Sequence, residues 1–185
     1  MGVNPLACFG VGPTGSLLCT PGRSGILIFA RVKEKLVTDL WLAIFHHVLV
    51  FGLAIMLGAQ AVLVREGMTA SDTARVAGLD IGYGATSGLI VLVGVARVIY
   101  GAKGYLYYVE NVWFWAKMAT FATIGLLSIR PTLRFRAWQK ARAADPGFAP
   151  PPAEIRGTRL LVLLEVRLLV LVVAFAATMA RYTSI

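Results

Sequence analysis

Charge is scarce in this sequence, and the scarcity excludes most soluble folds. Of its 185 residues, 18 are Lys or Arg and 9 are Asp or Glu, so charged residues make up 15% of the chain. A soluble domain covers its core with a surface that is roughly 25–35% charged. Since this chain has too little charge for such a surface, most of its exterior must face a lipid bilayer rather than water.

Histidine and cysteine are also scarce, with two of each. Cys8 and Cys19 precede the long apolar runs and form neither a CxxC motif nor a pair with a histidine, which argues against a metal or redox motif. A Ser-His-Asp set, a zinc cluster and a dinucleotide fingerprint are absent, and Gly101–Gly104 lacks the spacing of a P-loop. Whether the chain is an enzyme therefore stays open.

Long apolar runs are what the sequence has in abundance. Hydrophobic residues make up 58% of the chain, and the mean hydropathy is +0.75. About 20 apolar residues suffice to span the hydrocarbon, and four runs meet this length, over residues 40–64, 76–100, 111–129 and 160–180. Pro131 is expected to close the third, because proline lacks the N–H for the next helical hydrogen bond. The predicted fold is all-α, a polytopic four-transmembrane-helix bundle over residues 37–185.

Basic residues predict the orientation. The segment 130–159 carries seven Lys and Arg residues, whereas the connection before the third run carries only Lys103. The positive-inside rule therefore places residues 130–159 in the cytoplasm and both termini outside, in a bacterial inner (cytoplasmic) membrane. The stretch 131–143 is predicted to be a basic interfacial helix with Phe135 and Trp138 touching lipid, and residues 130–142 are expected to meet anionic lipid. The net charge of +9 is assigned to these contacts rather than to nucleic acid.

Residues 1–36 are expected to be a poorly structured N-terminal extension. They are rich in Gly, Pro and Ser, and their apolar run GILIFA is too short to span a membrane. No charged n-region precedes a long apolar segment, so they do not resemble a signal peptide. One hypothesis is a start assigned too far upstream: Lys33-Glu34 could be encoded as a ribosome-binding site and Val37 as a GTG start. A native peptide from residues 5–30 would refute it.

Four segments carry a family resemblance. They are FHHVLVFGLA at 45–54, ARVIYGAKG at 96–104, NVWFWAK at 111–117 and GLLSIRPTLRF at 125–135. These segments resemble the DUF2214 family of uncharacterised bacterial membrane proteins, most closely over residues 37–142. The resemblance implies an inner-membrane protein and supplies no activity.

A more distant similarity concerns His46 or His47 and the sequence Trp115-Ala116-Lys117. A histidine in the first helix and a later Trp-x-Lys also occur in the membrane-type protoporphyrinogen oxidase and copper-resistance D families. That oxidase family has a further histidine about three turns after its Trp-x-Lys, where this chain has Ser128. The departure weighs against both haem ligation and oxidase activity of that kind.

Ionisable residues inside membrane spans are costly, so each is a candidate for function. The helical rise of 1.5 Å per residue places His46, His47, Arg97 and Lys117 at a similar depth, and we name them the outer polar layer. It has no evident carboxylate partner, so it would favour an anion such as a propionate or phosphate, and a neutral imidazole could ligate haem iron, for example in haem b. At most one histidine can reach one iron, so bis-histidine ligation requires a dimer or another ligand. Alternatively, the Arg97 and Lys117 side chains extend to the membrane interface, and the two histidines form hydrogen bonds between helices.

A second set lies nearer the cytoplasm, and we name it the inner polar layer: Gln60, Asp80, Glu165 and Arg167. Opposite charges there could neutralise one another, and Asp80 with Arg167 is the preferred pair. The interpretation favoured by this pattern is interhelical stabilisation rather than catalysis.

Small residues follow one side of the second run, with GxxxG spacings at Gly78–Gly82 and Gly84–Gly88. They are expected to let this helix pack closely against its neighbours. Three functions remain: a membrane protein binding haem or a related porphyrin; a non-enzymatic accessory or structural subunit, with a homo-oligomer or another membrane protein as partner; and a small-solute or copper transporter. The last is least favoured, because no Met or Cys cluster offers soft ligands.

Overall fold

The computed structural model describes residues 6–11, 17–21 and 23–181, with side chains described from residue 32 onward. It confirms the predicted fold class, because four helices are long and apolar enough to cross a membrane. The elements in chain order are β1 (Leu6–Val11), β2 (Leu17–Pro21), α1 (Arg23–Leu63), α2 (Ala70–Tyr100), α3 (Tyr105–Val109), α4 (Val112–Ala144) and α5 (Pro152–Arg181).

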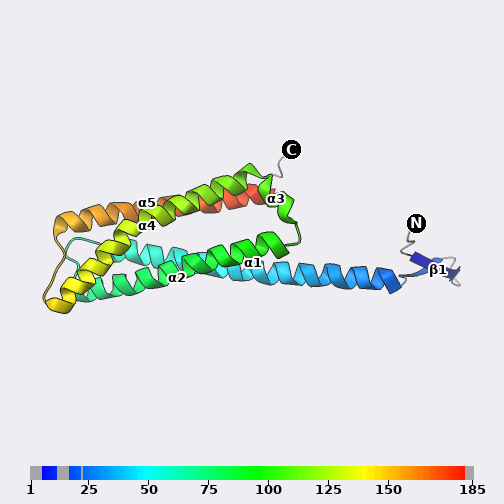
Figure 1. The fold of residues 1–185 in the computed structure, drawn as a ribbon, viewed down its shortest axis with the longest axis horizontal. Coiled ribbons are helices and arrows are strands. Elements are labelled where there is room, and N and C mark those ends of the chain that lie inside the picture. Colours follow the sequence, from blue (N-terminus) through cyan, green and yellow to red (C-terminus); the bar gives the residue numbers. More distant parts are fainter. Residues whose placement is uncertain (1–5, 12–16, 22, 182–185) are drawn as a thin grey trace.

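The four long helices run antiparallel to their sequence neighbours (Figure 1). Helices α1 and α2 form one hairpin, α4 and α5 form the other, and the hairpins meet through α2 with α4 and through α1 with α5. The α1–α2 and α4–α5 connections lie at one end of the bundle, and α3 lies at the other with the C-terminal end of α5 (Figure 1). This alternation is the one that four successive membrane crossings require.

Helix α1 begins well before the predicted span of residues 40–64. It covers 41 residues, which at 1.5 Å per residue is ~60 Å, about twice the thickness of the hydrocarbon. Its N-terminal part projects beyond the bundle toward the antiparallel β1–β2 hairpin (Figure 1). The N-terminal extension therefore contains two strands and the first turns of α1, while residues 1–5, 12–16 and 22 lie outside the described part.

Two helix starts follow from capping residues. Thr69 caps α2: its backbone N–H donates to the Asp72 carboxylate at 2.9 Å, and its hydroxyl accepts from the Asp72 backbone N–H at 3.3 Å. Asn111 caps α4 by accepting from the Trp113 backbone N–H at 2.9 Å. Such side chains satisfy amides that the first helical turn leaves without partners.

Pro131 does not end the third span, so that prediction is wrong. Helix α4 continues through Pro131 to Ala144, and its C-terminal part, in yellow, turns away from α5 (Figure 1). Proline removes one intrahelical hydrogen bond and commonly bends a helix where packing compensates. Pro131 is buried, and two residues after it, Phe135 and Trp138, join the core.

Phe135 and Trp138 are 1% and 2% exposed. The expectation that they touch lipid is therefore wrong, because the bend turns this side of α4 inward. Most of the remaining core is aliphatic, with Leu57, Val64 and Val162 fully buried, and it also contains Tyr83 and Met68. Apolar residues also cover the outside, as at Ile55 and Leu126, both more than 70% exposed. This exterior suits lipid contact along the spans.

Candidate functional site

His46 of α1 lies against Gly94 of α2. Its Cε1 is 3.7 Å from the point that a Cβ at Gly94 would occupy, so the glycine leaves room for the imidazole. The His46 Nδ1 atom is buried and has no hydrogen-bond partner within the described residues. A buried polar atom without a partner is uncommon in native structures and calls for an explanation.

Arg97 of α2 faces Asp39 of α1, and the two side chains form an ion pair in which Arg97 Nε and Asp39 Oδ1 are 4.0 Å apart. The expectation that the outer polar layer lacks a carboxylate partner is therefore wrong. Asp39 lies about two helical turns before His46, just outside the predicted span, where the extended α1 presents it to Arg97. A helical projection started before residue 40 would have found it.

Lys117 of α4 is partly buried, with its Nζ 5.2 Å from the centroid of the Phe114 ring. The charges of Lys117 and Arg97 both act on the His46 imidazole, and that of Arg97 acts on Lys117. The structure thus brings together three of the four residues predicted for the outer polar layer, one each from α1, α2 and α4.

His47 points away from this group. Its side chain is exposed, and its ring centroid is 6.3 Å from that of His46 with the ring planes at 86°. Its Nδ1 lies 2.6 Å from the Ala43 carbonyl oxygen. Because a carbonyl can only accept, Nδ1 donates the proton, and a neutral His47 then carries its free lone pair on Nε2. Histidines that ligate metals are commonly oriented in this way.

Helix α3 lies at the same end of the bundle as the outer polar layer, in contact with α2 and α4. Tyr108 is 6% exposed, and burial raises the pKa of its phenol. The neighbouring Tyr107 hydroxyl donates to the Met179 carbonyl of α5 at 2.8 Å and accepts from Lys103 Nζ at 3.1 Å. Trp113 and Trp115 are exposed instead. Tyr108 is thus the most deeply buried tyrosine of α3.

The inner polar layer pairs differently from the prediction. Asp80 accepts a 2.9 Å hydrogen bond from the Thr132 hydroxyl of α4, while the Arg167 side chain is exposed. The predicted Asp80–Arg167 pair is therefore wrong. The reason is twofold: α4 continues past Pro131 and supplies Thr132, and Arg167 lies on a different side of α5 from the buried Glu165. Tyr83, which no sequence motif singles out, donates to Glu165 Oε2 at 3.4 Å.

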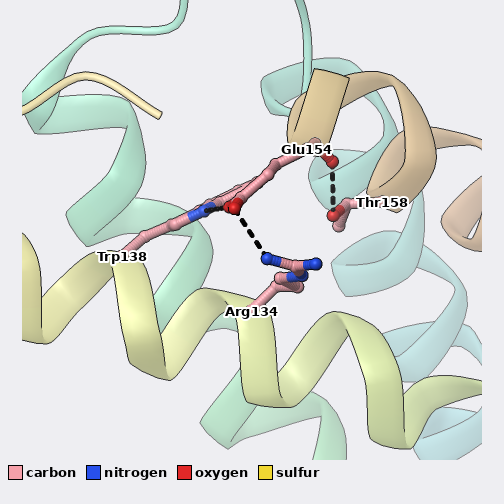
Figure 2. Close-up of polar contacts among 4 residues, drawn as sticks. All are labelled: Arg134, Trp138, Glu154 and Thr158. Carbon is pink, nitrogen blue, oxygen red and sulfur yellow. Dashed lines mark hydrogen bonds and ion pairs between the residues drawn. The ribbon is translucent and has the colours of Figure 1, made fainter. Parts of the chain in front are cut away.

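A third cluster ties α4 to α5 at the predicted cytoplasmic end. Figure 2 shows Glu154 reaching both Trp138 and Arg134, with Nε1···Oε2 and Nη1···Oε1 distances of 2.8 and 2.7 Å. The Thr158 hydroxyl donates to the Glu154 backbone carbonyl at 2.8 Å. Each oxygen of the carboxylate has a donor, so the Glu154 side chain links α4 to the first turn of α5.

A family model described as "Predicted membrane protein (DUF2214)" matches residues 38–183. The chain belongs to the DUF2214 family. No curated protein and no solved structure matches it. The DUF2214 match covers the first candidate span from residue 38 onward and the other three in full, and it includes Asp39, so every polar cluster above falls within the family's own domain.

Metal binding by side chains alone has no support in this DUF2214 bundle. Among the residues that the structure describes, no three His, Cys, Asp or Glu side chains lie close enough to hold an ion.

Proposed function

We propose that this DUF2214 protein binds haem or a related porphyrin at the outer polar layer, near the outer face of a bacterial inner membrane. His46 would be an axial ligand, and Arg97 and Lys117 would contact the carboxylates of the macrocycle. The observation that carries the proposal is the partnerless His46 Nδ1 beside two cations. Bound haem would supply one-electron chemistry, tuned by its axial ligands and surroundings.

The charges of the layer suit a dianionic group. Asp39 offsets one of the two cations, Arg97, at 4.0 Å, and Lys117 has no ion-pair partner among the described residues. Burying a cation without a counter-charge is costly, so an incoming carboxylate would relieve that cost at Lys117. It would also compete with Asp39 for Arg97, whose Nε makes no hydrogen bond in the described part of the chain.

A single chain can offer haem iron only one histidine as an axial ligand. His46 and His47 are adjacent on α1 and so point roughly 100° apart around the helix, which prevents both from ligating one iron. A second axial position would be filled by a side chain other than histidine, or by the exposed His47 of a second copy.

Titration of detergent-purified protein with ferric haem tests the cation contacts. Charge-assisted hydrogen bonds contribute about 1.5–3 kcal/mol each, so Arg97→Gln and Lys117→Ala should each weaken binding by roughly tenfold or more. Arg167→Gln, which removes an exposed cation elsewhere in the bundle, is the matched control and should leave binding unchanged. Equal affinities in all four proteins would contradict the proposal.

An accessory or structural role is the second candidate, and one observation favours it. Gly84 and Gly88 of α2 are exposed, and a Cβ at either position would meet nothing within 4 Å. The GxxxG pair thus lies on the outside of the bundle, where such spacing allows another helix to approach closely. Under this alternative, Gly84→Leu and Gly88→Leu would break a defined oligomer or complex, whereas Gly125→Leu, at an exposed glycine of α4, would not. An assembly unaffected by any of them would exclude this interface.

A further inference from the structure

Two carboxylates are buried in the inner polar layer with little compensating charge. Asp80 is 7% exposed and Glu165 is 1% exposed, and Gln60 and Tyr83 beside them are 2% and 5% exposed. Met56 of α1 lies beside Gly82 of α2, so Gln60, one turn further along α1, comes level with residues 78–80 of the antiparallel α2. Side chains from α1, α2 and α5 therefore meet at one depth.

Asp80 is well provided with partners. It accepts from the Thr132 hydroxyl at 2.9 Å, and the charge of Arg136, also on α4, acts on it. A donor and a nearby cation both stabilise the ionised carboxylate. Asp80 is therefore the member of the pair suited to carry the negative charge.

Glu165 is poorly provided with partners. Its Oε2 accepts only a long 3.4 Å hydrogen bond from Tyr83, and its Oε1 has no partner within the described residues. Across the layer, the Gln60 Nε2 is also buried without a partner. Arg167, two residues along α5, is exposed and offers no ion pair. The negative charge of Asp80 acts on Glu165, which makes a second ionised carboxylate there more costly still.

We propose that Glu165 is a proton-binding site inside the membrane bundle. Its carboxylate takes up one proton to become the neutral acid and releases it again, and no other bond forms or breaks. Tyr83 of α2 donates to it, the charge of Asp80 of α2 acts on it, and Gln60 of α1 lies at a similar depth, with Arg136 of α4 acting through Asp80. An intramembrane carboxyl without a counter-ion is the type of residue that proton relays use. This inference is independent of the haem proposal, which concerns the other end of the bundle.

Infrared spectroscopy of the full-length protein in detergent, recorded from low to high pH in water and in D₂O, tests the proposal. The wild type should show a deuterium-sensitive carboxylic-acid carbonyl band that disappears as the pH is raised. Glu165→Gln should lose this band, whereas Asp80→Asn and the exposed-site control Glu110→Gln should keep it. Tyr83→Phe, which changes no charge at neutral pH, should shift its frequency.

Two outcomes would overturn the proposal. One is a band that persists in Glu165→Gln and does not move in Tyr83→Phe. The other is a wild-type protein with no such band at any pH; a saturable spectral change on adding Na⁺ would then assign the layer to a metal cation. If Glu165→Gln fails to fold, the Tyr83→Phe shift alone decides whether the band belongs to Glu165.

Discussion

Trp138 donates its indole Nε1–H to Glu154 at 2.8 Å, and this bond joins the part of α4 beyond Pro131 to the first turn of α5. Arg134 holds the other carboxylate oxygen at 2.7 Å. Helix α5 thus holds in place the part of α4 that follows Pro131. This contact explains how α4 tolerates an interior proline.

Glu154→Ala should therefore destabilise the bundle more than Glu154→Gln. Alanine leaves the nearly buried Trp138 N–H without an acceptor, at a cost of about 1–3 kcal/mol in the free energy of unfolding. Glutamine keeps an acceptor for Trp138 and loses only the charge facing the half-exposed Arg134. Thermal unfolding in detergent, followed by circular dichroism, measures the difference. A midpoint for Glu154→Ala equal to that of the exposed control Glu110→Ala would contradict this account.

Asp39→Asn should tighten haem binding. The substitution removes the carboxylate that competes for Arg97, so binding should strengthen by about threefold to tenfold, corresponding to roughly 1 kcal/mol. Combining it with Arg97→Gln should abolish the gain, because the two side chains act as a pair. Haem titration of the two single variants and the double variant provides the test, and weaker binding by Asp39→Asn would show that Asp39 itself supports the ligand.

Gly82 and Gly84 should respond differently to the same substitution. A Cβ at Gly82 would lie 3.1 Å from Met56 Sδ, whereas one at Gly84 meets open space. Gly82→Leu should therefore separate α1 from α2 and lower the free energy of unfolding by about 1–3 kcal/mol. Gly84→Leu should leave the stability of the monomer unchanged. Equal midpoints for the two variants would place the α1–α2 contact elsewhere.

Membrane orientation can be tested with single cysteines in a chain whose Cys8 and Cys19 are replaced by serine. Asp145→Cys lies in the α4–α5 connection and should react with an impermeant maleimide only in inverted vesicles. Lys103→Cys lies at the opposite end and should react in intact spheroplasts. The reverse pattern would place the basic segment outside and refute the predicted orientation.

The four helices could be predicted because each contains a run of apolar residues long enough to cross the bilayer. Their ends could not, because hydropathy does not report a helix that continues beyond the hydrocarbon. For this reason the start of α1 at Arg23 and the continuation of α4 past Pro131 to Ala144 were not predicted. The burial of Trp138 depends on a partner, Glu154, that only the folded chain brings to it.

The candidate site, too, could be predicted only in part. Depth follows from helical rise, so His46, Arg97 and Lys117 could be placed in one layer from their positions alone. The rotation of a helix about its own axis does not follow from helical rise. The sequence of α5 is apolar on nearly all sides and does not show which face meets the bundle. The Asp80–Arg167 prediction is wrong for this reason. Asp39 was missed because it lies just before the apolar run.

The absorption spectrum of detergent-purified protein, expressed with ample haem and recorded oxidised and dithionite-reduced, tests the central proposal most directly. We expect a Soret band that His46→Ala removes, while His47→Ala, which alters an exposed ring, leaves it in place or changes only the second axial position. Loss of the band in His47→Ala alone would show that the iron is bound on the outside of the bundle. A featureless wild-type spectrum would contradict haem binding and favour the accessory role.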